Sequence, residues 1–91
     1  MTTLCIKAIV SGKVQGVFYR NNTRKKALSL NITGWVKNNS DQTVELMACG
    51  EHDHINQLIE WLWKGPDRAR VTNVAWMEIP SERQNGFIIV R

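Results

Sequence analysis

Alternating apolar and polar side chains predict the strands of this chain. In the run from Leu4 to Val10, every second residue belongs to one apolar face, the period-two pattern of a strand with one buried side. Strands are also predicted over residues 34–38, 43–49 and 71–79, and a short last strand over 87–90. Four polar residues separate the second strand from the third, so these two strands should form a hairpin.

Two helices are predicted where apolar or small residues recur every three or four positions. Their stripes consist of Thr23, Ala27 and Leu30 in the first helix and of Ile55, Leu58, Ile59 and Leu62 in the second. The first helix is expected to begin at Asn21–Thr23 and to end at Asn31 or Gly34. Asp53 is the expected cap of the second helix, and Gly65-Pro66 should stop it.

The order of these elements predicts the fold class. It is strand, helix, strand, strand, helix, strand, with a small strand added at the end. This order is typical of the α+β class and of the ferredoxin-like split βαβ sandwich, in which a mixed, mostly antiparallel sheet carries two helices on one face. Right-handed crossovers make the first two strands parallel, with the third inserted antiparallel between them. The loop after the first strand and Asn38, at the end of the second, should therefore emerge at the same edge of the sheet.

The positions of the tryptophans predict which of their side chains face the core and which face solvent. Val74 and Trp76 are expected to face the core from the strand over residues 71–79. Trp61 and Trp63 are two positions apart on one helix, so they cannot both face the core. One of these two rings should lie across the surface.

Residues 11–20 join the first strand to the first helix and contain the main candidate chemistry of the chain. Gly12 and Gly16 let the backbone bend so that successive N–H groups point into one concavity beside a helix N-terminus, an arrangement that binds anions. Arg20 adds a cation whose planar fork matches phosphate or carboxylate oxygens. The loop lacks the Walker and dinucleotide-binding patterns, and taken alone it also fits an ordinary turn that contains an arginine.

Composition and charge narrow the class of protein and of partner. The 91 residues are 43% hydrophobic and 22% charged, which is typical of one globular domain, and no linker or repeat divides residues 1–91. The opening does not resemble a signal peptide, and no apolar run approaches the roughly 20 residues of a membrane span, so we expect a cytoplasmic protein without membrane contact. A net charge of +4 favours anionic partners, either a small substrate or a nucleic acid.

Cysteine and histidine positions leave two further interpretations open. By alternation, Cys5 and Cys49 fall on the face that the helices do not cover, on neighbouring antiparallel strands. Two reduced, half-exposed thiols are expected by default, and a cross-strand disulfide between them is the alternative. His52 and His54 have a spacing that could suit a metal, but we interpret them as solvated residues of a helix first turn and expect no metal site.

Two segments resemble the signatures of a known family. Residues 12–20, Gly-Lys-Val-Gln-Gly-Val-Phe-Tyr-Arg, resemble the Gly-x-Val-Gln-Gly-Val-x-Phe/Tyr-Arg signature of acylphosphatases. Residues 34–38, Gly-Trp-Val-Lys-Asn, followed by Val44 and Gly50 at the family spacing, resemble the second signature. Gln42 departs from that pattern, which has glycine in the turn, so a turn that needs a positive φ would be strained at Gln42.

The resemblance implies hydrolysis of the mixed anhydride of acyl phosphates to carboxylate and inorganic phosphate, without a metal or other cofactor. Arg20 would bind the phosphoryl oxygens, and Asn38 would orient the attacking water. The main-chain N–H groups that would help to bind the substrate belong to Gln15, Gly16, Val17, Phe18, Tyr19 and Arg20. The partners are then small molecules, the acyl phosphate and inorganic phosphate, and a monomer is the default. Such a shallow site should read the phosphate headgroup and little of the acyl group.

Other classes of protein share this order of elements. An RNA-binding module would stack bases on aromatic residues of the open faces of the first and third strands. Those positions contain no aromatic residue, so we expect no nucleic-acid partner; they are Cys5, Lys7, Ile9, Thr43, Glu45, Met47 and Cys49. A metal- or effector-binding regulatory domain would leave Arg20 and Asn38 as structural residues only. Related domains also begin a larger carbamoyl-phosphate-handling hydrogenase-maturation protein, whereas a chain that ends after its last strand favours a freestanding enzyme.

Overall fold

Strands and helices follow one another along the chain in the expected order. The computed structural model describes residues 3–81 and 85–90. Its elements are β1 (Thr3–Lys13), α1 (Tyr19–Ser29), β2 (Thr33–Asn38), β3 (Val44–Glu51), α2 (His52–Lys64), β4 (Arg70–Ile79) and β5 (Phe87–Val90). Between the strands expected over 71–79 and 87–90, the sequence predicts a loop over Pro80–Asn85, of which residues 82–84 lie outside the described residues.

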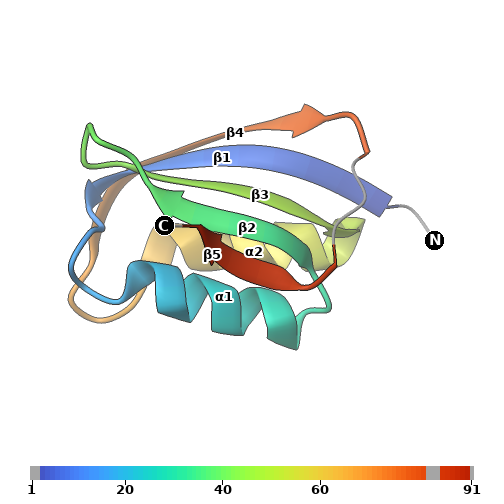
Figure 1. Cartoon of the computed structure of the whole chain (residues 1–91), viewed down its shortest axis with the longest axis horizontal. Coiled ribbons are helices and arrows are strands. Elements are labelled where there is room, and N and C mark those ends of the chain that lie inside the picture. The colour runs from blue at the N-terminus through green and yellow to red at the C-terminus, as the bar shows by residue number, and fades with distance from the viewer. Residues whose placement is uncertain (1–2, 82–84, 91) are drawn as a thin grey trace.

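The strands form a five-stranded sheet that carries both helices on one face (Figure 1). The strand order is β4-β1-β3-β2-β5. Neighbouring strands are antiparallel, apart from β2 and β5, which are parallel. α1 packs on β2 and β5, whereas α2 packs on β1, β3 and β4. The expected ferredoxin-like α+β class is confirmed, including the insertion of β3 between β1 and β2.

A buried core lies between the sheet and the helices. The inward residues of β1 include Ile6, Ala8 and Val10, which are fully buried as their alternation predicted. The helix stripes face the same core; Thr23, Ala27, Ile55, Leu58 and Leu62 are buried, and Leu30 and Ile59 are partly buried against them. Burial of this apolar surface stabilises the fold and fixes which face of each helix meets the sheet.

The first helix begins earlier than the sequence suggested. α1 starts at Tyr19, directly after Phe18, whose φ of 62° turns the chain into the helix. No side-chain hydrogen bond caps this start, so the polar residues Asn21–Thr23 are not the helix boundary that they predicted. Arg20 is consequently the second residue of α1 rather than the end of a loop.

At the other end of α1, only one of the two expected stop residues acts there. The helix ends at Ser29, and Asn31, with a φ of 56°, reverses the chain after it. Gly34 lies instead inside β2, with a φ of 149°. A Cβ at Gly34 would overlap the main-chain oxygen of Met47 on β3, so the close approach of these two strands requires glycine.

The second helix begins without the expected aspartate cap. The residue at the N-cap of α2 is Glu51, and no side-chain hydrogen bond closes it. Asp53 lies in the first turn, where the helix dipole favours a negative charge. Gly65 ends the helix as expected. His52 and His54 lie in the first turn, exposed and partly exposed, and residues 3–81 and 85–90 contain no cluster of three metal-ligating side chains.

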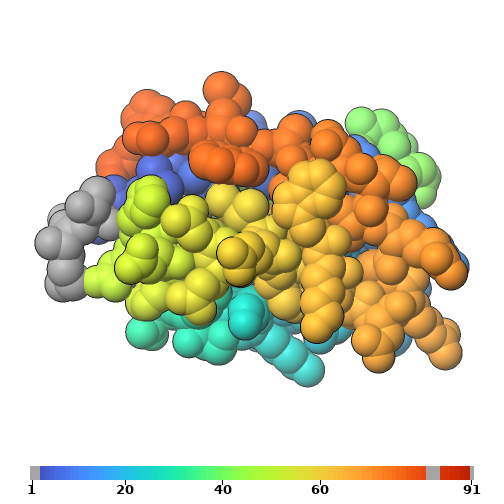
Figure 2. Space-filling view, turned by 180° about the vertical axis from the view of Figure 1, so that it is seen from behind, coloured from blue at the N-terminus to red at the C-terminus, as the bar shows by residue number. Residues whose placement is uncertain are grey.

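Trp76 lies on the core side of the sheet, as expected, but it is not buried there. Trp76 pairs with Ala8, which places it on the core side of the sheet, yet it is 47% exposed, whereas Val74 is buried as expected. The reason is that β4 is an edge strand, so no further strand covers the outer side of the ring. Trp63 is 49% exposed and Trp61 is partly buried, as expected for this pair. Figure 2 shows this edge of the sheet from behind, with β4 in orange along the top, above α2 in yellow.

The helix-free face of the sheet has a small buried cluster of its own. Cys5 of β1 pairs with Cys49 of β3, and a disulfide joins them, so the default expectation of two half-exposed thiols was wrong. The exposed fractions of the two cysteines are 2% and 5%, because Met47, Trp35 and Ile79 pack around them. The sequence could not decide this, since it does not give the Cα separation of 4.1 Å.

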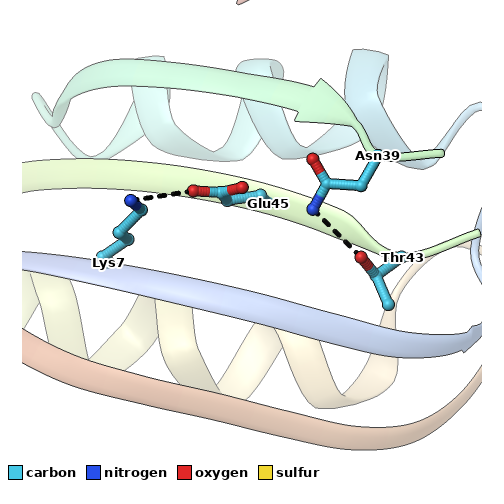
Figure 3. Close-up of polar contacts among 4 residues, drawn as sticks. All are labelled: Lys7, Asn39, Thr43 and Glu45. Carbon is cyan, nitrogen blue, oxygen red and sulfur yellow. Dashed lines mark hydrogen bonds and ion pairs between the residues drawn. The ribbon is translucent and has the colours of Figure 1, made fainter. Parts of the chain in front are cut away.

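Polar side chains cover the same face nearer the hairpin of β2 and β3 (Figure 3). Lys7 Nζ lies 3.0 Å from Glu45 Oε2, and Asn39 Nδ2 donates a hydrogen bond of 3.1 Å to Thr43 Oγ1. Burial alone would raise the pKa of Glu45, but hydrogen bonds from Lys7 and Asn39 and nearby positive charge outweigh it and lower that pKa. In an RNA-binding module, these positions of β1 and β3 would carry aromatic side chains that stack on bases. Here they carry an ion pair and a disulfide instead.

Candidate active site

A cavity of about 290 Å³ opens where β1 ends and α1 begins. Its lining includes Gly16 of the connecting segment, Arg20 of α1, Asn38 of β2 and Ile89 of β5. In Figure 1 the blue loop after β1 and the green hairpin after β2 lie at the same end of the sheet. The expectation that the topology brings the loop and Asn38 to one edge is therefore confirmed.

The start of α1 gives this cavity an electropositive main chain. Gly16 and Phe18 have φ angles of 74° and 62°, and these two left-handed residues turn the backbone from β1 into the helix. The first hydrogen bond of the helix runs from the Asn22 N–H to the Phe18 carbonyl at 3.1 Å. The N–H groups of Tyr19, Arg20 and Asn21 precede it and have no helical acceptor. Such N–H groups, at the positive end of a helix dipole, suit an anion.

Arg20 adds a full positive charge to the same cavity. As the second residue of α1, it is half-buried and lines the cavity beside the N–H groups of its own first turn. Among the described residues, no acidic side chain forms an ion pair with its guanidinium. The five N–H donors of that group are therefore available to the oxygens of a bound anion.

Asn38 reaches the cavity from the end of β2, and the hairpin after it is held to the loop. Gln15 Nε2 donates two hydrogen bonds of 2.9 Å, to the carbonyl oxygens of Asn39 and Thr43. The Asn39 N–H in turn donates to the Thr43 carbonyl at 2.9 Å. The side chain of Gln15 thus ties the segment that carries Arg20 to the hairpin that carries Asn38. The sequence predicts Gln15 only as a main-chain donor, because a sequence does not show which carbonyl groups the side chain of a glutamine will meet.

The hairpin turn has the strain that its sequence suggested. Gln42 has a φ of 75°, in the left-handed region that glycine adopts more easily. The turn has a compensating interaction, because the Thr43 hydroxyl and N–H both donate to Asp41 Oδ1, at 2.6 and 3.1 Å. Those two hydrogen bonds lower the pKa of the exposed Asp41 carboxyl. The family glycine is therefore replaced without loss of the positive φ.

Tyr19 lines the cavity, but its side chain is buried in the core. Its residue position lines the cavity, but its side chain is 1% exposed, and its hydroxyl donates a hydrogen bond of 2.6 Å to the Leu62 carbonyl of α2. The ring also packs against Trp61 with a centroid separation of 5.6 Å. Burial raises the pKa of Tyr19 strongly, which keeps the hydroxyl neutral. The side chain therefore anchors the start of α1 and has no role as an acid or base.

The six expected binding residues separate into two groups. Gly16, Phe18, Tyr19 and Arg20 line the cavity, whereas Gln15 and Val17 do not, and Val17 is buried in the core. Ile89 was missed, although its position on the last strand, beside the parallel β2, would have suggested it. Arg24 Nε donates to the Phe87 carbonyl at 2.9 Å and so ties α1 to this strand.

Comparison with known proteins agrees with this geometry. The family model named Acylphosphatase matches residues 6–89. The chain belongs to the acylphosphatase family. The expected enzyme class, an acylphosphatase, is confirmed with it. An acylphosphatase of Coxiella burnetii is 60% identical over 83 residues, which are 91% of this chain and 87% of that protein.

Solved acylphosphatases share the fold over nearly the whole chain. A structure of an acylphosphatase from Coxiella burnetii has a TM-score of 0.94 at 56% identity and covers 97% of this chain and 93% of its own. The crystal structure of acylphosphatase from Bacillus subtilis also has a TM-score of 0.94, at 34% identity, and covers 97% of this chain and 99% of its own.

The described residues include no helix long and apolar enough to cross a membrane.

Proposed function

We propose that this acylphosphatase-family chain hydrolyses the carboxyl–phosphate bond of acyl phosphates without a metal, and that Arg20 and Asn38 are its catalytic residues. The observation that supports the proposal is one cavity lined by three features: a cation that has no ion-pair partner among residues 3–81 and 85–90, the N-terminal turn of a helix, and a side-chain amide. The first two bind a phosphoryl group. The side-chain amide of Asn38 offers a further polar contact in the same cavity for the attacking water.

The reaction needs few groups, because its leaving group is stable. The bond between phosphorus and the bridging oxygen breaks, and the acyl group leaves as a carboxylate whose conjugate acid has a pKa of about 4, so no general acid is required. The transition state of phosphoryl transfer is loose, with little bond formation to water, so a strong base is also dispensable. What is left for the protein is to stabilise charge and to position water.

Each proposed residue has one task in this scheme. Arg20 and the main-chain N–H groups between Gly16 and Arg20 hold the phosphoryl oxygens. Asn38 orients the attacking water, since an amide cannot take up its proton. That proton passes to a phosphate oxygen of the substrate. Gln15 takes part through its side chain, which fixes the position of the hairpin.

The site recognises the part of the substrate that all acyl phosphates share. Acetyl phosphate, carbamoyl phosphate and 1,3-bisphosphoglycerate have the same carboxyl-phosphate headgroup, and this headgroup dominates recognition. We propose one functional domain over residues 1–91, in agreement with the family match to 6–89. A cytoplasmic location and a monomeric state remain predictions.

Release of inorganic phosphate from benzoyl phosphate by the purified protein in excess EDTA tests the proposal. We expect rapid hydrolysis that EDTA does not reduce. The Arg20→Gln variant should lose at least about 1,000-fold in kcat/KM, because it removes the charge that stabilises the transferring group. Absence of hydrolysis by the folded wild-type protein would overturn the proposed activity, and full activity in Arg20→Gln would overturn the role of Arg20.

A further inference from the structure

Phe18 is an unusual residue for its place in the structure. It is 71% exposed, more than any other large apolar residue among those that the structure describes. Its φ of 62° lies in the region that glycine and asparagine occupy most readily. Its side chain makes no capping hydrogen bond for α1. Neither core packing nor the backbone conformation therefore accounts for a phenyl ring at this position.

The location of Phe18 suggests what the ring contacts. Phe18 lines the same cavity as Arg20 and Asn38. Of the other apolar residues in that lining, Val14 and Tyr19 are buried, and only Ile89 is partly accessible. When the phosphoryl group of an acyl phosphate lies against Arg20, its acyl group must extend from the bridging oxygen toward the mouth of the cavity. Phe18 and Ile89 are the accessible apolar residues of the lining that it can contact.

We propose that Phe18 and Ile89 form an apolar subsite for the acyl group of the substrate. The inference rests on the proposed hydrolysis of acyl phosphates and adds a substrate preference to it. Acyl phosphates with an aromatic or branched apolar group bury surface against these residues in the transition state, whereas acetyl and carbamoyl phosphate bury little. The preferred substrate class is thus an acyl phosphate with an apolar acyl group.

The expected preference is modest, because Phe18 is 71% exposed and therefore cannot enclose the acyl group. A single aromatic contact changes kcat/KM by about three- to tenfold. Such a factor is compatible with a site in which the phosphate headgroup dominates recognition. The preference is measured as the ratio of kcat/KM for benzoyl phosphate to that for acetyl phosphate, so a general effect on the loop cancels.

The experiment compares this ratio in the wild-type protein and in four variants. In Phe18→Ala and Phe18→Gly the ratio should fall about three- to tenfold, and the glycine variant also suits the left-handed backbone, so it is expected to fold. Phe18→Tyr, which keeps an aromatic ring, should retain the ratio. Met77→Ala is the matched control, because Met77 is 64% exposed on β4 and does not line the cavity.

The outcomes separate this inference from the proposed function. A wild-type protein that hydrolyses both substrates, with the same ratio in Phe18→Ala and Phe18→Gly, would overturn the apolar subsite alone. A folded wild-type protein that hydrolyses neither substrate would overturn both proposals. A fall of the ratio in Met77→Ala equal to that in Phe18→Gly would also contradict the subsite, since it would assign the effect to a distant surface.

Discussion

Arg20 and Asn38 line one cavity from two different elements and offer it different chemistry. Arg20 has a permanent charge and five donors, which suit the equatorial oxygens of a phosphoryl group. Asn38 is neutral and exposed at the end of β2, and its amide can both donate to and accept from a water. Binding of phosphate should therefore depend on Arg20, and alignment of the attacking water should depend on Asn38.

At this scale we predict that Asn38→Ala lowers kcat by about 100- to 1,000-fold, because a positioned polar group is lost from the transition state. Inhibition by inorganic phosphate should persist in this variant and weaken in Arg20→Gln. Steady-state kinetics with benzoyl phosphate, with phosphate as competitive inhibitor, measure both quantities. Phosphate inhibition that is lost in Asn38→Ala and kept in Arg20→Gln would mean that the two roles are reversed.

At the scale of elements, the site depends on how α1 is held. Its first residue, Tyr19, is buried against α2 and donates a hydrogen bond to the Leu62 carbonyl. Arg24, further along α1, donates a hydrogen bond to the Phe87 carbonyl of β5. Gln15 fixes the opposite wall, because it bonds to two carbonyl groups of the β2–β3 hairpin. These hydrogen bonds connect the N-terminal turn of α1 to the core and the hairpin that carries Asn38 to the preceding loop in the absence of substrate. Such preorganisation is what electrostatic catalysis requires.

The Tyr19 anchor predicts a pH dependence of stability. Burial raises the pKa of Tyr19 in the folded protein, so the unfolded chain ionises first, at a pKa of about 10, and unfolding above that pH releases a proton. The stabilisation is fully present below pH of about 10 and falls at higher pH by up to about 1.4 kcal/mol per pH unit. Urea unfolding of the wild type at pH 8 to 11 measures this slope, and Tyr19→Phe should lack the Tyr19 contribution.

Absorbance of tyrosinate provides the control for that experiment, because the chain contains one tyrosine. Tyrosinate should form together with unfolding and not before it. A folded protein whose tyrosine titrates near its ordinary pKa would contradict the buried anchor.

At the scale of the whole molecule, the disulfide and the cavity lie at opposite ends of the sheet. Cys5 pairs with Cys49, whereas Val10 pairs with Val44, the residue opposite Asn38. Five residues along a strand span about 17 Å. The disulfide joins positions 44 residues apart, so it restricts the unfolded chain strongly, and none of its residues lines the cavity.

We therefore predict that the Cys5→Ala/Cys49→Ala double variant loses about 3–4 kcal/mol in the free energy of unfolding. Its kcat/KM for benzoyl phosphate should stay within about twofold of the wild type at temperatures where it is folded. Urea unfolding, with the reduced wild type as a second reference, measures the loss. A folded double variant with tenfold lower kcat/KM would show that the disulfide also affects the cavity.

The sequence by itself determined the order of elements, the helix stripes and the strand faces, because burial of apolar surface imposes periods of two and 3.6 residues. It also determined that the loop after β1 and Asn38 share one edge of the sheet, since the handedness of crossovers leaves little choice. The signature residues between Gly12 and Arg20 and from Gly34 to Asn38 were sufficient for the family.

Tertiary structure alone decided features that depend on distances between distant segments. The disulfide depended on the separation of Cys5 and Cys49, and the requirement for glycine at position 34 depended on the approach of Met47. α1 begins at Tyr19 because that side chain is buried against α2, a contact that outweighs the polar signal at Asn21–Thr23. Local propensity is weaker than packing, and packing partners far apart in sequence are known only when the chain has folded.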